Sequence, residues 1–231
     1  MFDITPPEWT AILLSLRVAT VATLIATPAG VAIAWLLARR EFWGKALLDA
    51  VVHLPLVLPP VVTGYLLLLS FGRRGLFGGW LADHLGLVFS FRWTGAALAC
   101  GVMSFPLLVR PIRLSIEAVD RRLEQAASTL GAAPWRVFLT VTLPLALPGI
   151  LAGMVLGFAK AIGEFGATIT FVSNIPGETQ TISSAIYALI QTPEGDSAAL
   201  RLVAVSVVIS MVALIGSEWF ARRATRRLHG L

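Results

Sequence analysis

Five long apolar segments constrain the fold of this chain more than any other feature of its sequence. They cover about 10–38, 46–71, 94–114, 144–165 and 200–220. A helix that crosses a bilayer needs about 20 such residues, and in lipid a helix satisfies its own backbone hydrogen bonds. Charged residues make up 13% of the 231 residues, against roughly 25% in a soluble domain. The sequence therefore predicts an all-α integral membrane protein with about five transmembrane helices, forming a single domain over 1–231 with its core at about 8–220.

Prolines and glycines within these segments predict how the helices bend and pack. Three prolines between positions 55 and 60 interrupt the second span, which should be kinked or broken because proline removes a backbone hydrogen bond. Glycines recur at every fourth position over 149–157 and predict a face for close helix contact. An apolar stretch at 182–190 is too short to cross a bilayer. It predicts a short interfacial or re-entrant helix on the outer side.

The distribution of lysine and arginine predicts how the chain is oriented, because these residues accumulate in cytoplasmic loops. An external N-terminus leaves four basic residues outside and twelve inside. The outer residues are Arg73, Arg74, Arg92 and Arg201. The inner residues are Arg39, Arg40, Lys45, Arg110, Arg113, Arg121, Arg122, Arg136 and, in a basic tail over 221–231, Arg222, Arg223, Arg226 and Arg227. The C-terminus and the polar loop at 115–143 are therefore predicted to be cytoplasmic.

The polar loop at 115–143 contains a helical pattern of its own. Apolar residues fall at i, i+3, i+4 and i+7, which places them on one face of a short helix. They are Leu123, Ala126, Ala127 and Leu130, with Arg121, Arg122, Glu124 and Gln125 beside them. Gly131 should end this helix, Pro134 can begin another, and Pro144 marks the return to the membrane. Such a helix suits the groove of a partner protein, and the alternative is a helix lying on the lipid surface.

The same loop resembles the EAA loop of ABC importer permeases. That motif places Glu-Ala-Ala, Gly and Ile-x-Leu-Pro at a fixed spacing, and this chain has Gln125-Ala126-Ala127, Gly131 and Val141-x-Leu143-Pro144. The resemblance implies a type I ABC importer permease fold, with the loop as a coupling helix gripped by a cytoplasmic ATPase. The residues implied in ATPase docking are Leu123, Glu124, Gln125, Ala126, Ala127, Leu130, Gly131, Leu143 and Pro144. Gln125 lacks the charge of the usual Glu, and Glu124 could replace it in a contact with the ATPase.

Three further blocks, at 53–62, 103–107 and 163–179, look like the permeases of molybdate ABC transporters. The resemblance extends over about 8–220. It implies a homodimer in the bacterial cytoplasmic (inner) membrane, two cytoplasmic ABC ATPase subunits and an external, periplasmic molybdate-binding protein. It also implies translocation by alternating access. Molybdate, tungstate and sulfate or thiosulfate stay open as substrates, because selection would rest largely with the binding protein.

Glu164 is an acidic residue at membrane depth, where carboxylates are costly and mark functional or paired sites. Two interpretations stay open for it: a gate or pathway residue, and an ion pair with Lys160 one turn earlier. Ser173 and Asn174 offer neutral donors for an oxyanion, although a polar loop would look the same. The candidate gate or pathway residues are Glu164, Phe165, Gly166, Thr168, Ser173 and Asn174.

The sequence lacks the common motifs of catalysis. It has no Gly-x-x-x-x-Gly-Lys-Ser/Thr loop for ATP, its three histidines are scattered, and its one cysteine, Cys100, lies in an apolar run. We therefore predict no catalytic residue, no metal site and no cofactor on this chain, with ATP and magnesium on the partner ATPase. No nucleic-acid partner is expected, since the net charge of +5 reflects membrane orientation. A membrane-embedded enzyme and a passive channel are the alternatives from other classes.

Overall fold

The computed structural model describes residues 4–228, with side chains over 4–216, and every regular element in this part is helical. In chain order the elements are α1 (Pro6–Arg39), α2 (Lys45–Val57), α3 (Pro60–Phe71), α4 (Leu76–Leu85), α5 (Trp93–Glu117), α6 (Arg121–Thr129), α7 (Pro134–Val137), the π-helical turn η1 (Phe138–Thr142), α8 (Leu143–Ile162), α9 (Gly166–Val172), α10 (Ile182–Leu189) and α11 (Asp196–Leu228).

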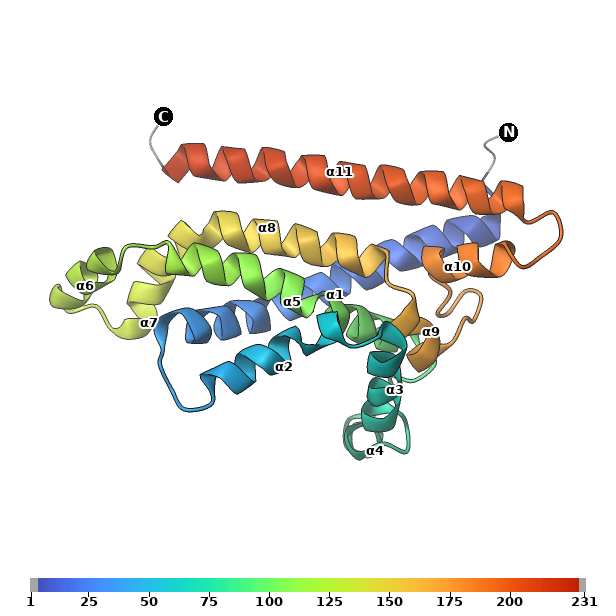
Figure 1. Ribbon diagram of the computed structural model, residues 1–231, viewed down its shortest axis with the longest axis horizontal. Helices are drawn as coiled ribbons and strands as arrows, with labels where there is room; N and C mark the ends of the chain where they lie inside the picture. The colour runs from blue at the N-terminus through green and yellow to red at the C-terminus, as the bar shows by residue number, and fades with distance from the viewer. Residues whose placement is uncertain (1–3, 229–231) are drawn as a thin grey trace.

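Four long apolar helices form the body of the molecule, and the bent pair α2 and α3 brings the number of candidate spans to five. The four run along the long axis in Figure 1, with α5 packed between α1 and α8. Cys100 and Met103 of α5 lie in one buried cluster, and Leu108 and Ile112 lie in a second one nearer the α6 end. The predicted all-helical membrane fold is therefore confirmed.

The glycine stripe of α8 faces α5, as the sequence predicts. A Cβ atom on Gly149 would lie 2.7 Å from the carbonyl oxygen of Pro111, and one on Gly153 would lie 2.6 Å from that of Leu108. Gly157 also faces Leu108 and Ser104, at ordinary van der Waals distances of 3.6–4.0 Å from their side chains. Without side chains at these positions the two backbones approach closely, which is how small residues stabilise helix pairs in a membrane.

The second span is broken, as its prolines predict. Helices α2 and α3 meet at an angle of 116° across Leu58 and Pro59. After this bend α3 packs against α9, where a Cβ atom on Gly64 would lie 2.5 Å from the carbonyl oxygen of Ala167. The bend thus places the start of α3 against the segment that follows α8.

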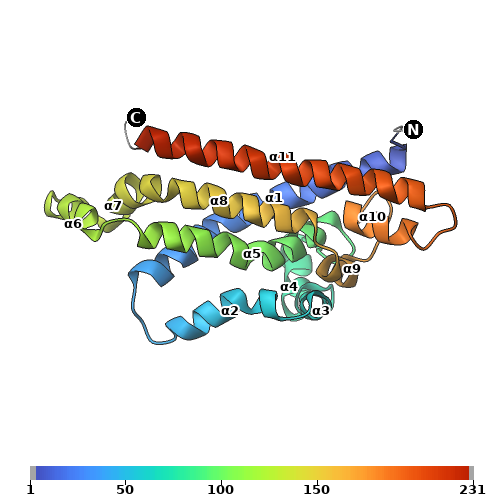
Figure 2. The ribbon, with the colours of Figure 1, turned by 45° about the horizontal axis from the view of Figure 1, so that its top comes forward.

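The two ends of the long axis carry different elements. Figures 1 and 2 both show α6 and the end of α11 at one end, and the start of α1 with α10 at the other. The short helix predicted at 182–190 is present as α10. Two further short helices, α4 and α9, lie between the predicted spans.

Several helices begin or end at other residues than the predicted spans. The fourth span was expected at 144–165, yet one continuous helix extends over 134–162, so Pro144 lies inside it and does not mark its start. Helix α5 continues to Glu117, three residues beyond the predicted span. Helix α11 extends from Asp196 to Leu228, beyond the predicted 200–220. The side chains of the basic tail, 221–231, lie outside the described residues.

Candidate functional sites

Helix α6 projects from the end of the bundle and has no buried residue. Asp120 caps it by accepting the backbone N–H of Arg122 at 2.9 Å. It ends as predicted at Gly131, whose φ of 86° favours glycine, and Pro134 begins the next helix. Leu123 and Leu130 are exposed, the latter at 89%, together with Ala126, while Ala127 is half-buried. The predicted apolar stripe is therefore present, and nothing in the described part of the chain covers it.

The opposite side of α6 faces an open cleft of about 480 Å³ next to the end of α1. Arg39, Arg40 and Arg121 line this cleft, and so does Gln125. The usual Glu of the motif would therefore share this cleft with three arginines of its own chain. Leu143 and Pro144 are half-buried in the first turn of α8, away from the exposed stripe.

Glu124 points inward, which contradicts the idea that it could serve an ATPase in place of the missing Glu. Its Oε1 atom accepts a hydrogen bond from Thr142 Oγ1 at 2.6 Å and pairs with Arg39 Nη2 at 3.1 Å. The same guanidinium donates to the carbonyl oxygen of Val119 at 3.1 Å. The carboxylate is thus held within this chain.

Substituting Gln125→Glu is expected to stabilise the protein, because the new carboxylate would join the arginines of the cleft. The gain should be up to about 1 kcal/mol for such a partly exposed group, and it should shrink in high salt. Thermal unfolding in detergent at low and high salt measures it. Gln191→Glu, at an exposed site after α10, serves as the control, although it also loses the hydrogen bond that Gln191 Nε2 donates to the Tyr187 carbonyl oxygen. An equal or larger gain in this control would show that the cleft has no special effect.

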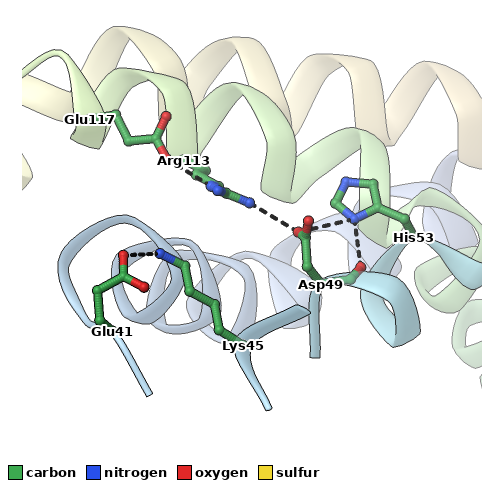
Figure 3. A network of polar contacts seen from close by, with 6 residues as sticks. All are labelled: Glu41, Lys45, Asp49, His53, Arg113 and Glu117. Carbon is green, nitrogen blue, oxygen red and sulfur yellow. Dashed lines mark hydrogen bonds and ion pairs between the residues drawn. The ribbon is translucent and has the colours of Figure 1, made fainter. Parts of the chain in front are cut away.

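A second polar network joins α2 to α5 (Figure 3). Arg113 of α5 donates from Nη1 to Asp49 of α2 at 3.0 Å and from Nε to Glu117 on its own helix at 2.8 Å. The ring of His53 lies 3.4 Å from the Asp49 carboxylate. Val52 is the one buried residue of α2, so this network adds to a small apolar contact between α2 and the bundle.

At the other end of α8, Glu164 is buried and paired with Lys160. Lys160 Nζ lies 2.6 Å from Glu164 Oε2, and Oε1 accepts the backbone N–H of Ala167 at 2.9 Å. The side chain of Glu164 is 1% exposed and that of Lys160 30%. The predicted ion pair is therefore present, and the carboxylate also caps α9. A role as gate or pathway residue remains a hypothesis.

Three other candidates near Glu164, from Phe165 to Thr168, contact α10, α3 and their own helix. The ring of Phe165 lies 4.9 Å from that of Tyr187, and Thr168 donates its hydroxyl to the Phe165 carbonyl at 2.9 Å. A Cβ atom on Gly166 would lie 2.7 Å from Cβ of Pro60, at the bend between α2 and α3. Thr168 is thus engaged in its own helix, and Gly166 provides a close contact.

Ser173 and Asn174 lie in the turn after α9. Ser173 is exposed with φ of 65°, in the left-handed region that non-glycine residues seldom adopt. Asn174 donates to the carbonyl oxygen of Ser184 at 3.5 Å, and its buried Oδ1 atom has no partner among the described residues. Thr179 fixes the turn by accepting from Ile175 N and donating to the carbonyl oxygen of Ser173. Asn174 Oδ1 is therefore the polar atom here that the chain itself leaves unsatisfied.

The structure adds two residues that the sequence did not single out as site residues, Arg39 and Thr142. In the sequence, Arg39 is one of the basic residues that predict orientation, and Thr142 is the unspecified position of the Val141-x-Leu143-Pro144 motif. Each is far from Glu124 in sequence, by 85 and 18 positions. No local periodicity links them, so the contact could not be read from spacing.

Comparisons with known proteins assign the class of this membrane bundle. Residues 26–226 match the family described as binding-protein-dependent transport system inner membrane component. The chain therefore belongs to this family of transport permeases. It is 62% identical to the molybdenum transport system permease protein ModB of Escherichia coli strain K12, over 97% of this chain and 98% of that protein. The corresponding protein of Haemophilus influenzae is 56% identical over 96% of each chain.

A sulfate relative and two solved structures extend the comparison. The sulfate transport system permease protein CysT of Escherichia coli is 36% identical over 92% of this chain and 76% of that protein. A bacterial ABC transporter for alginate import has a chain with a TM-score of 0.73 at 19% identity, covering 95% of this chain and 80% of that one. The MetNI methionine ABC transporter gives a TM-score of 0.72 at 14% identity, over 96% and 100%. The two structures establish that the fold is that of ABC importer permeases.

Proposed function

We propose that this chain is the membrane-spanning subunit of an ATP-driven importer that carries molybdate into the cytoplasm by alternating access. The observation that carries this proposal is the uncovered apolar face of α6 at one end of the bundle. An apolar helical stripe exposed to water favours a partner groove, and membership of a transport family makes an ATPase the fitting partner.

The assembly that we propose consists of two copies of this chain, two cytoplasmic ABC ATPase subunits and an external molybdate-binding protein. ATP and magnesium would bind to the ATPases, so this chain would supply the pathway and catalyse no reaction. The N-terminus would lie outside the inner membrane, and α6 with the C-terminus would lie in the cytoplasm. The basic residues near α6 support this orientation.

Molybdate is proposed over sulfate because the two relatives that match at 62% and 56% are molybdenum permeases, whereas the sulfate permease matches at 36%. Tungstate and thiosulfate would use the same machinery if the binding protein delivered them. In the turn after α9, the unsatisfied Oδ1 atom of Asn174 is a hydrogen-bond acceptor, as are the oxygens of an oxyanion. A contact between the two would need a bridging water or a protonated ligand.

Reconstituted transport tests this function. Proteoliposomes that contain the permease and its ATPase, with the binding protein outside and ATP inside, should take up radioactive molybdate. Sulfate in tenfold excess should compete weakly. Uptake of sulfate without molybdate would refute the substrate, and uptake that needs no ATP would favour a passive channel.

A further inference from the structure

Three segments of the chain meet at one carboxylate oxygen beneath α6. Glu124 Oε1 of α6 contacts Arg39 Nη2 at the last residue of α1 at 3.1 Å, and it accepts from Thr142 Oγ1 at 2.6 Å. Thr142 is the last residue of η1, within the continuous helix that contains α8. Arg39 also donates to the carbonyl oxygen of Val119, just before α6. We call Arg39, Glu124 and Thr142 the α6 junction.

The α6 junction is partly shielded from water. The side chain of Arg39 is 8% exposed and that of Glu124 19%, and Thr142 is buried. Glu124 has no other cation within ion-pair distance in the described part of the chain. Separating the pair would leave a poorly solvated charge without a partner, which is costly. The junction should therefore stay closed while the rest of the molecule moves.

The contact between α2 and α5 that Arg113 makes in Figure 3 should cost less to break than the α6 junction. If α2 moved away from α5, Arg113 would keep Glu117. The side chain of Asp49 is 40% exposed, so water would solvate its carboxylate and this contact can open at little cost. Breaking the α6 junction is therefore costly, whereas breaking the contact between α2 and α5 is not.

Helix α6 needs the α6 junction to hold it against the bundle, because the chain on either side of it is not helical. Residues 118–120 link it to α5, and residues 130–133 with Gly131 link it to α7. No residue of α6 is buried, so apolar packing against the bundle does not hold it. Without the α6 junction, we expect a force on α6 to tilt this helix about the two links and to leave α8 in place.

We propose that Glu124 is a positioning residue that passes the movement of α6 into α1 and into the helix of α8. The π-helical turn at Phe138–Thr142 is a fitting place for this transfer, because π turns inside helices are frequent at functional sites. The inference rests on the proposed function, in which an ATPase moves α6. Glu124 touches neither substrate nor nucleotide and acts through its two partners.

The amount of molybdate taken up per ATP hydrolysed tests the inference, in proteoliposomes of the full complex with the binding protein. Glu124→Ala and Thr142→Val should each assemble with the ATPase and hydrolyse ATP. Their uptake per ATP should fall by about tenfold, within the usual range of coupling between distant sites. Thr142→Val keeps the side-chain shape and the Arg39–Glu124 pair, so it tests transfer to α8 by itself.

Two further variants sharpen the test. The exchanged pair Arg39→Glu with Glu124→Arg should recover part of the lost uptake per ATP, because it restores the ion pair but not the hydrogen bond from position 39 to the Val119 carbonyl oxygen. Glu117→Gln removes a carboxylate from an ion pair at the same end of the molecule that is not part of the α6 junction, and it should keep the wild-type ratio. A merely structural role of Glu124 would lower thermal stability and reduce uptake and hydrolysis in proportion, leaving their ratio unchanged.

The outcomes separate the inference from the function on which it rests. If the wild-type complex takes up molybdate with ATP while Thr142→Val and Glu124→Ala keep its uptake per ATP, the inference is overturned and the proposed function stands. If Glu124→Ala fails to assemble, the ratio of Thr142→Val decides in the same way. If the wild-type complex hydrolyses ATP without any uptake, the proposed function fails and the inference fails with it.

Discussion

Replacing Lys160 with methionine is expected to destabilise the protein by about 3–5 kcal/mol, because it leaves a buried carboxylate without its cation. Glu164 is 1% exposed, and Lys160 Nζ is its partner at 2.6 Å. The hydrogen bond from Ala167 N would remain, but it does not neutralise the charge. Thermal unfolding in detergent or nanodiscs measures the loss, and Lys160→Arg should retain most of the stability.

The exposed pair of Glu41 and Lys45 is the matched control. It has the same spacing and a similar distance of 2.7 Å, yet Glu41 is almost fully exposed. The ammonium of Lys45 lowers the pKa of Glu41 through a hydrogen bond and charge attraction. Water screens such a contact, so Lys45→Met should leave the unfolding temperature unchanged. If it lowered that temperature as much as Lys160→Met, burial would not explain the effect.

The double variant Lys160→Met with Glu164→Gln distinguishes the two interpretations of Glu164. Removing both charges leaves no unpaired ion, so most of the stability should return. If Glu164 only fixes α9 to α8, molybdate uptake should return together with stability. If Glu164 acts in the pathway, the protein should be stable while its uptake stays low.

Substituting Leu130→Glu is expected to prevent assembly with the ATPase while the permease remains folded. Leu130 is 89% exposed, so a charge there costs the isolated chain little. In an apolar groove the same charge would lose its water, and the apolar contact of Leu130 would be lost as well. Residues at the centre of an interface contribute about 2 kcal/mol or more, a loss of about 30-fold in affinity. Affinity purification of the tagged permease with its ATPase measures this change.

Leu85→Glu provides the control for that prediction. Leu85 is an exposed leucine at the end of α4, away from α6 in Figure 1. It should leave ATPase binding at the wild-type level. Normal assembly of the Leu130→Glu variant would contradict the docking role of α6.

The parts of this structure that could be predicted are those determined by residues close together in the sequence. The stripe from Leu123 to Leu130, its end at Gly131, the break near Pro59 and the small-residue face of α8 each follow from local spacing or backbone chemistry. The Lys160–Glu164 pair was predictable for the same reason, since its partners are one helical turn apart.

The unpredicted parts depend on distant contacts or on an unusual backbone. The inward turn of Glu124 depends on Arg39, which lies 85 positions earlier. The helix continues through Pro144 because η1 precedes it, with Leu143 N donating to the carbonyl oxygen of Phe138. A wider turn relieves the clash that a proline ring otherwise causes with the preceding turn. Helix α9 could not be predicted because only three residues, 163–165, separate it from α8, and Glu164 caps it from within that short link.

The central claims are that α6 lies on the cytoplasmic side of the membrane and that it contacts the ATPase. Labelling of the Leu130→Cys variant tests both directly. The chain's one natural cysteine, Cys100, is buried and should not react with a membrane-impermeant maleimide. We expect labelling in inside-out vesicles, no labelling in right-side-out vesicles, and protection when the ATPase is bound. Labelling of right-side-out vesicles, or equal labelling with and without the ATPase, would contradict the account.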